Sequence, residues 1–93
     1  MWVRIQEVSF PAERADQVIA HVRNTSVSRN DGHGFRGFRL LVDRPNGRAL
    51  EVSYWETEDD ATAGRSASES TETDLPGGVL ERSTFYELAI DGG

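Results

Sequence analysis

Alternating residues at the start of the chain predict a β-strand over residues 2–10. Its β-branched and aromatic side chains are typical of strands. Because successive strand side chains point to opposite faces, the alternation places Arg4, Gln6, Val8 and Phe10 on one face and Val3 and Ile5 on the other. Polar side chains stand among the apolar ones, so at least one face of this strand is not a plain hydrophobic core.

The next segment predicts an amphipathic helix over residues 11–24. Pro11 suits the first helical position, and apolar residues recur at helical spacing at Ala15, Val18, Ile19 and Val22. His21 lies beside this apolar stripe, so we expect a solvated side chain. Residues 25–34 are rich in types that compete with helical hydrogen bonding, and they are predicted to form a loop.

A hairpin is predicted next, after a repeated Gly-Phe-Arg motif at residues 34–39. The first strand alternates Phe38, Leu40 and Val42 with Arg39, Leu41 and Asp43. A turn at residues 44–47 has Pro45 at its second position and Gly47 at its end. The partner strand, residues 48–56, places Leu50, Val52 and Tyr54 on one face and Glu51, Ser53 and Trp55 on the other.

A second, weaker helix is predicted from Thr57, which can cap it with Asp60 three residues later. Residues 64–78 are polar and hold little that a core could bury. The simpler interpretation is a short helix followed by a solvated connector; the alternative is a mobile flap over a pocket. A last strand is predicted over residues 79–90.

This order of elements predicts an α+β, ferredoxin-like βαββαβ fold, with a four-stranded antiparallel sheet and both helices on one face. The other face would still carry apolar residues, among them Val3, Ile5, Val52 and Tyr54. An exposed apolar surface of that size marks an interface. We therefore expect one domain over residues 1–93 that pairs with a second copy of itself.

Composition excludes several classes of function. The net charge of −6 argues against a nucleic-acid partner, and the absence of cysteine excludes disulfides and thiolate chemistry. No membrane span or signal peptide is recognisable, so we expect a soluble, cytoplasmic protein. There is no phosphate loop or zinc spacing. The acidic residues 58–60 fit a helix start, so no metal is expected.

Residues 34–61 resemble the strand–hairpin–helix region of antibiotic biosynthesis monooxygenase domains, which belong to the dimeric α-β barrel superfamily. The matching features are Gly34-Phe35, Gly37-Phe38, Leu40-Leu41, the glycine turn, and Trp55-Glu56-Thr57 before an acidic helix start. The resemblance implies a dimeric α+β barrel without a cofactor. It also implies one of two activities, namely oxygenation of polyphenols to quinones or oxidative haem degradation.

The resemblance assigns site residues as well. An Asn on the first strand of the haem-degrading pattern falls on Gln6, and its Trp falls on Trp55, which makes these two the candidate catalytic residues. Arg4 would join Gln6 in stabilising oxyanion charge. The histidine that ligates haem has no counterpart in residues 61–75, so haem degradation is not expected.

Three further residues would border the pocket and contact substrate: Phe35, Phe38 and His33. The phenylalanines are better interpreted as packing residues, since burying an aromatic ring is itself strongly favourable. His33 lies in a glycine-rich loop. It is either a base near the pocket or, more simply, a solvated loop residue.

Two functions remain in competition. The first is a cofactor-independent monooxygenase, an oxidoreductase without a prosthetic group that acts on an aromatic or polyphenolic small molecule. The second is a non-catalytic dimeric module that binds a small ligand or serves a structural role. The weak second helix favours the module, because a reaction pocket needs a lid that excludes water. The resemblance favours the enzyme.

Overall fold

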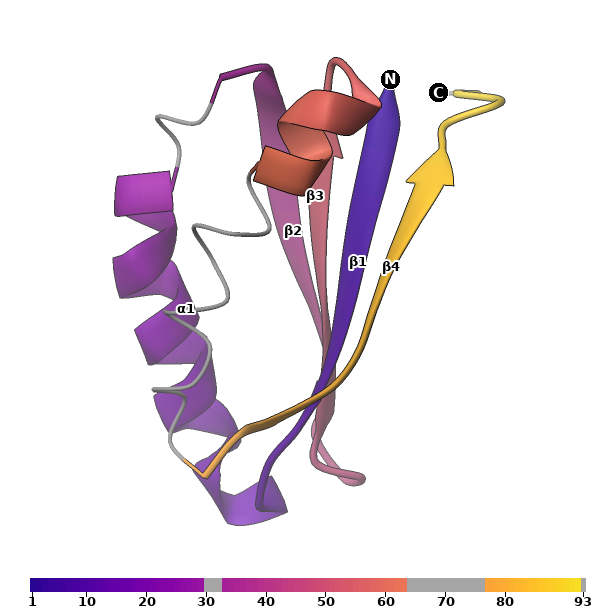
Figure 1. Cartoon of the computed structure of the whole chain (residues 1–93). Helices are drawn as coiled ribbons and strands as arrows, with labels where there is room; N and C mark the ends of the chain where they lie inside the picture. Colours follow the sequence, from indigo (N-terminus) through magenta and orange to yellow (C-terminus); the bar gives the residue numbers. More distant parts are fainter. Residues whose placement is uncertain (30–32, 64–76, 93) are drawn as a thin grey trace.

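Four strands form one antiparallel sheet in the order β2-β3-β1-β4 (Figure 1). The structure is a computed structural model and describes residues 1–29, 33–63 and 77–92. Its strands are β1 (Trp2–Ser9), β2 (Phe35–Asp43), β3 (Arg48–Trp55) and β4 (Val79–Glu87). This strand order is that of a ferredoxin-like fold, so the predicted α+β topology is confirmed.

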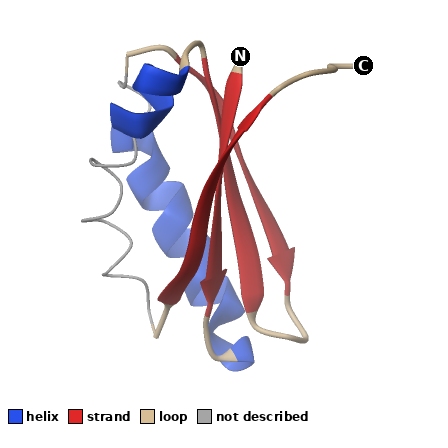
Figure 2. Cartoon of the chain, turned by 45° about the vertical axis from the view of Figure 1, so that its right-hand side comes forward, coloured by secondary structure: helices blue, strands red, loops and turns tan. Residues whose placement is uncertain are grey.

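The helices lie together on one face of the sheet, as predicted (Figures 1 and 2). A short 3-10 helix η1 (Ala12–Arg14) leads into α1 (Ala15–Arg29), and a second helical segment covers residues 58–63. The backbone N–H of Asp60 donates to Thr57 Oγ1 at 3.1 Å. Thr57 is therefore the predicted cap of that second segment.

Helix α1 is longer than the sequence pattern predicted. It continues to Arg29, so the prediction of a loop over residues 25–34 is wrong for residues 25–29. No Gly or Pro interrupts those residues. Once α1 has formed, each further residue adds a hydrogen bond, and this outweighs the weak helix propensity of Thr and Ser.

Two smaller expectations are also wrong. Strand β4 ends at Glu87 rather than at residue 90, because its neighbour β1 begins at Trp2, the residue that pairs with Glu87. His21 is half-buried, and its Nε2 is covered. It follows Val18 by about one helical turn, so it lies at the flank of the buried stripe rather than in solvent.

The hydrophobic core lies between α1 and the sheet. Its buried members come from β1 and the residue after it, from α1 and from β3, and they are Val8, Phe10, Ala15, Val18, Val22 and Ala49. Phe38, Leu40 and Val42 of β2 pack against them. The even positions of β1 and β2 thus face the helices, as the alternation predicted. The predicted connector or flap, residues 64–78, falls almost entirely outside the described residues.

The repeated glycines mark an irregular start to β2. Phe35 lies opposite Trp55 and Gly37 lies opposite Tyr54, so Arg36 is an extra residue in a β-bulge. Gly34 has φ +77°, and a Cβ there would lie 2.0 Å from Asp60 Oδ2. Only glycine fits this close approach. The motif therefore turns the chain beside the second helical segment.

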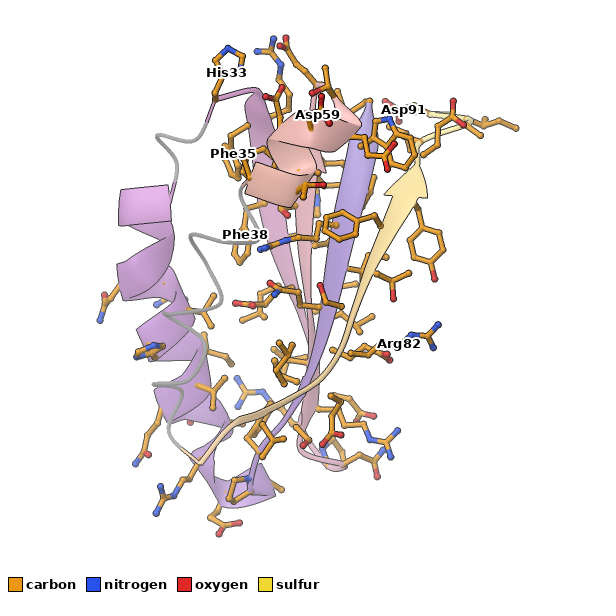
Figure 3. The ribbon with its side chains drawn as sticks, in the orientation of Figure 1. His33, Phe35, Phe38, Asp59, Arg82 and Asp91 are labelled. Atoms are coloured by element: carbon orange, nitrogen blue, oxygen red, sulfur yellow. The ribbon has the colours of Figure 1, made fainter. Side chains whose placement is uncertain are left out.

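The opposite face of the sheet has no helix over it in the described part of the chain (Figure 2). It carries the residues that the alternation assigned to it, Val3 and Ile5 of β1 and Leu50, Val52 and Tyr54 of β3. Leu41 and Tyr86 lie on it as well and are 52% and 49% exposed. Figure 3 shows Arg82 extending on this side, away from the helices. We call this surface the uncovered face.

Among the described helices, none is both long enough and apolar enough to cross a membrane.

Candidate functional site

Four polar side chains are buried together on the helix-facing side of the sheet. Arg4 and Gln6 of β1 are 3% and 0% exposed, and Glu51 and Ser53 of β3 are 2% and 4% exposed. The strand register places Gln6 opposite Glu51 and Arg4 opposite Ser53. Residues paired in this way share a face and lie side by side. We call these four residues the polar cluster.

Strand β4 extends the polar cluster on its other side. Ser83 lies opposite Gln6, and Phe85 lies opposite Arg4. The hydroxyl of Ser83 is buried and makes no hydrogen bond within the described part of the chain. Three neighbouring strands thus carry a carboxylate, an amide and a hydroxyl in one row: Glu51, Gln6 and Ser83.

An aromatic pair lies at one end of the polar cluster, two residues beyond Ser53 along β3. Trp55 is 4% exposed, and its ring meets Phe35 edge to face, with centroids 5.3 Å apart and planes at 81°. The indole Nε1–H donates to Ser53 Oγ at 2.8 Å. Trp55 therefore contacts the polar cluster through its N–H and Phe35 through its ring. Because the N–H is already donated to Ser53, a ligand would contact Trp55 through the face of its ring.

Burial of two opposite charges sets the electrostatics of the cluster. Arg4 faces Ser53, which is two positions from Glu51 on the same face of β3. Such diagonal neighbours lie about 7–8 Å apart at their Cα atoms, within reach of long side chains. Burying either charge alone would cost several kcal/mol. Placing both in one cluster offsets part of that cost and leaves no net charge.

A groove runs between α1 and β2 beside the polar cluster. It has a volume of about 320 Å³ and is lined by Ile19, Val22, Arg23, Phe38, Leu40 and Val42. Phe38 and Leu40 are the register partners of Ser53 and Glu51. These two side chains therefore separate the groove from the polar cluster, and Figure 3 shows Phe38 on the helix side of the sheet.

His33 lies outside the polar cluster. Its side chain is 92% exposed in the turn before β2, at the edge of the molecule in Figure 3. Its Nδ1–H donates to Asp60 Oδ1 at 2.9 Å. Together with the close approach at Gly34, this bond fixes the start of β2 against the second helical segment.

The hydrogen bond from His33 holds the pKa of the Asp60 carboxyl below its usual range. Burial opposes this effect, and a hydrogen bond between the Thr57 side chain and the Asp60 carboxyl adds to it. We expect His33→Ala to raise the pKa of Asp60, while His21→Ala leaves it unchanged. A carboxyl with a lowered pKa stabilises the fold above the ordinary aspartate pKa, and that stabilisation is lost as the pH falls through the lowered value. Carbon-detected NMR titration of Asp60 measures the shift, and an unchanged pKa in His33→Ala would contradict the assignment.

The structure brings three predicted site residues together and separates two others. Arg4, Gln6 and Trp55 meet in and beside the polar cluster, and Phe35 packs on Trp55. Phe38 packs with the hydrophobic core, and His33 is on the surface.

Sequence reasoning missed Glu51, Ser53 and Ser83 as site residues. A usable signal existed for the first two, since they share a strand face with Trp55. Within the described ranges, no group of three or more His, Cys, Asp or Glu side chains is placed to hold a metal ion.

Comparison of sequences finds relatives without a described activity. No family model matches the chain. Two uncharacterised proteins of Mycobacterium tuberculosis, from strains CDC 1551 / Oshkosh and ATCC 25618 / H37Rv, are each 36% identical over 66 residues. The matched segment is 70% of this chain but only 30% of the length of those relatives.

Comparison of structures finds close folds at low sequence identity. The haem degrader MhuD of Mycobacterium tuberculosis, with two haems bound in its active site, superposes with a TM-score of 0.81 at 19% identity, and all of both chains is covered. A candidate antibiotic biosynthesis monooxygenase of Nitrosomonas europaea gives 0.71 at 16% identity, covering 97% of this chain and 100% of its own. Another from Deinococcus radiodurans gives 0.67 at 15% identity, covering 100% and 97%.

Structural similarity at this level of sequence identity establishes a common fold. It does not establish a common reaction, which has to be argued from the residues of the site. The strand order and the position of the described helices on one face of the sheet agree with that fold. The protein therefore has the fold of the antibiotic biosynthesis monooxygenases, as the resemblance over residues 34–61 predicted.

Proposed function

We propose that the protein is a cofactor-independent monooxygenase that oxidises an aromatic, polyphenolic small molecule. The observation that carries this proposal is the polar cluster of Arg4, Gln6, Glu51 and Ser53, which is buried beside the aromatic pair of Trp55 and Phe35. Ring faces next to buried donors and acceptors suit a flat substrate with hydroxyl groups. The fold shared with candidate antibiotic biosynthesis monooxygenases is consistent with this class.

In the proposed reaction a ring methylene of the substrate becomes a quinone carbonyl. The substrate anion supplies the electrons to dioxygen. One oxygen atom becomes the new carbonyl oxygen, and the other leaves as water with the two hydrogens of the methylene. Because the substrate itself is the reductant, the reaction requires no flavin, haem or metal.

The side chains of the polar cluster have distinct roles in this reaction. The guanidinium of Arg4 and the amide N–H of Gln6 are donors that stabilise negative charge on a substrate oxygen. The face of Trp55 holds the ring system, since its N–H is already donated to Ser53. Burial strengthens each of these interactions, because the surroundings respond less than water does.

Haem is a poorer fit to these residues. His21 is on α1, and His33 is exposed and bonded to Asp60. Neither histidine belongs to the polar cluster, and residues 61–75 contain none. The protein resembles MhuD in fold, but it lacks a histidine at the position where the family ligates haem.

We also propose that the protein is a homodimer that pairs through its uncovered face. A symmetric pair would bury Leu41 and Tyr86, which are half exposed in the single chain. An open groove of about 670 Å³ on the same face, lined in part by Leu41, Leu50 and Arg48, would receive the partner.

One observation favours a non-catalytic module instead. Each residue of the polar cluster is at most 4% exposed, and the N–H of Trp55 is satisfied by Ser53. Such a cluster can be a self-contained polar core that specifies the packing of the fold. Binding and turnover measurements separate the two functions.

Binding and oxygen uptake with 1,8-dihydroxyanthrone test the proposed function. We expect the compound to quench tryptophan fluorescence on binding and to be converted to its quinone with one dioxygen consumed, faster than in an enzyme-free blank. Gln6→Ala should lower kcat by about 100-fold, the usual loss for one oxyanion donor, with Kd changed less than about threefold. Gln17→Ala, an exposed change on α1, is the matched control and should behave as wild type.

Other outcomes would redirect the assignment. Binding without oxygen uptake would support the non-catalytic module. A stoichiometric haemin complex that yields a ring-opened product with a reductant would support haem degradation. If neither the anthrone nor haemin binds, the proposal is rejected.

A further inference from the structure

The geometry points to Glu51 as the catalytic base of this reaction, the group that takes the proton from the bound substrate. The assignment rests on the proposed function and adds a residue with a defined role. It comes from the position of Glu51 in the folded sheet, where burial, neighbours and distance from the aromatic pair act together.

Glu51 is an unusual residue in this fold. It is 2% exposed, and among the described residues it is the only acidic side chain that is buried. Its register partners are Gln6 on one side and Leu40 on the other. The carboxylate is thus enclosed between an amide and an apolar side chain that borders the groove between α1 and β2.

Stability is a weak reason for a buried pair of charges such as Arg4 and Glu51. Replacing both members of such a pair by well-packed apolar residues is often neutral or stabilising, because both charges must give up their hydration. The helix-facing neighbours of Glu51 toward the turn, Ala49 of β3 and Val8 of β1, are apolar and belong to the core. Ionisable groups retained in such a place beside an aromatic wall are characteristic of functional sites.

The spacing along β3 fits the size of the proposed substrate. Glu51 and Trp55 share a face and are four residues apart, which corresponds to about 13 Å at the usual rise of a strand. A linear polycyclic phenol whose first ring lies on Trp55 therefore extends past Arg4 and Ser53 toward Glu51. The base then meets the substrate beyond the indole, and Arg4 lies beside the intervening oxygen atoms.

In the proposed step Glu51 takes one proton from the ring methylene and later gives it back. An O–H bond forms on Glu51 as a C–H bond of the ring methylene breaks, and the electron pair stays on the substrate as a delocalised anion next to Arg4. The anion combines with dioxygen to give a peroxide, which takes the proton back from Glu51. That proton return regenerates the Glu51 carboxylate. The hydroperoxide then loses water, as its O–O bond and the remaining C–H bond of the former methylene break, and the quinone carbonyl forms.

Glu51→Gln and Glu51→Asp test the assignment with 1,8-dihydroxyanthrone, both unlabelled and deuterated at the ring methylene. We expect Glu51→Gln to lower kcat at least 100-fold, the typical contribution of a positioned base, with Kd within about threefold of wild type. Glu51→Asp keeps a carboxylate one methylene further away. It should retain partial turnover with a larger deuterium isotope effect, since proton removal becomes more fully rate-limiting. Glu13→Gln, an exposed change in η1, should match wild type.

The possible outcomes distinguish the proposed role of Glu51 from the proposed monooxygenase function. Wild-type kcat in Glu51→Gln, or an equal loss of binding and turnover, would overturn the role of Glu51 and leave the proposed function intact. If Glu51→Gln fails to fold by near-UV circular dichroism, Glu51→Asp decides, because an unchanged isotope effect there would also overturn it. Absence of oxygen uptake by wild type would reject both.

Discussion

Leu41→Asp should convert the protein from a dimer to a monomer. The side chain is 52% exposed on the uncovered face, so the single chain can solvate the new charge and remain folded. In a symmetric dimer the same substitution occurs twice. Each new carboxylate would lose its water without gaining a partner, at a cost of about 3–5 kcal/mol. We therefore expect the dissociation constant to rise by more than 100-fold.

Sedimentation equilibrium at micromolar concentration measures this change. The wild type should sediment at twice the chain mass of 10.3 kDa, and Leu41→Asp at the chain mass itself. Tyr86→Asp, on the other edge of the same face, should act in the same direction. Ala20→Asp places the same charge on the exposed side of α1 and should stay dimeric. A wild-type monomer, or a dimer that tolerates both Leu41→Asp and Tyr86→Asp, would contradict pairing through the uncovered face.

Trp55→Ala should remove about 3–5 kcal/mol from the free energy of unfolding, as expected for a buried tryptophan. The indole is 4% exposed, meets Phe35 edge to face and donates to Ser53. Truncation would create a cavity and leave the hydroxyl of Ser53 without this donor. Trp55→Phe keeps an aromatic ring and loses the N–H, so a smaller loss of about 1–2 kcal/mol is expected.

Urea unfolding followed by far-UV circular dichroism compares the two variants with wild type. Several protein concentrations are needed, because the proposed dimer would add to the apparent stability. Trp2 is only partly buried, so Trp2→Phe is a control that should cost less than Trp55→Phe. A loss below 1 kcal/mol in Trp55→Ala would show that the aromatic pair does not support the fold.

The two proposed roles of Trp55, packing and substrate binding, lead to different expectations for the same variant. Trp55→Phe keeps a ring opposite Phe35 and should weaken anthrone binding only modestly. The polar cluster beside it should respond differently, because we expect Gln6→Ala to change binding little and to lower turnover. Such a pattern across the variants would assign the rings to holding the substrate and the polar groups to stabilising its charge.

Prediction from sequence succeeded where local chemistry decides. Alternation in β1 placed Arg4 and Gln6 on one face and Val3 on the other, because the side chains of a strand alternate strictly. Gly34 and Gly37 marked a local irregularity, because glycine adopts backbone conformations that other residues avoid. Prediction from sequence failed at the C-terminal ends of α1 and β4. There, weak secondary-structure propensities compete with hydrogen bonds that depend on neighbouring elements.

By itself the sequence determined the order of the elements, the two faces of each strand, the cap at Thr57 and the apolar character of the uncovered face. Local periodicity and turn chemistry are sufficient for these features. Only the tertiary structure decided that Gln6 lies between Glu51 and Ser83, and that His33 bonds to Asp60 rather than joining the site. These pairings join residues far apart along the chain, and strand register and packing, which depend on the whole sheet, bring them together.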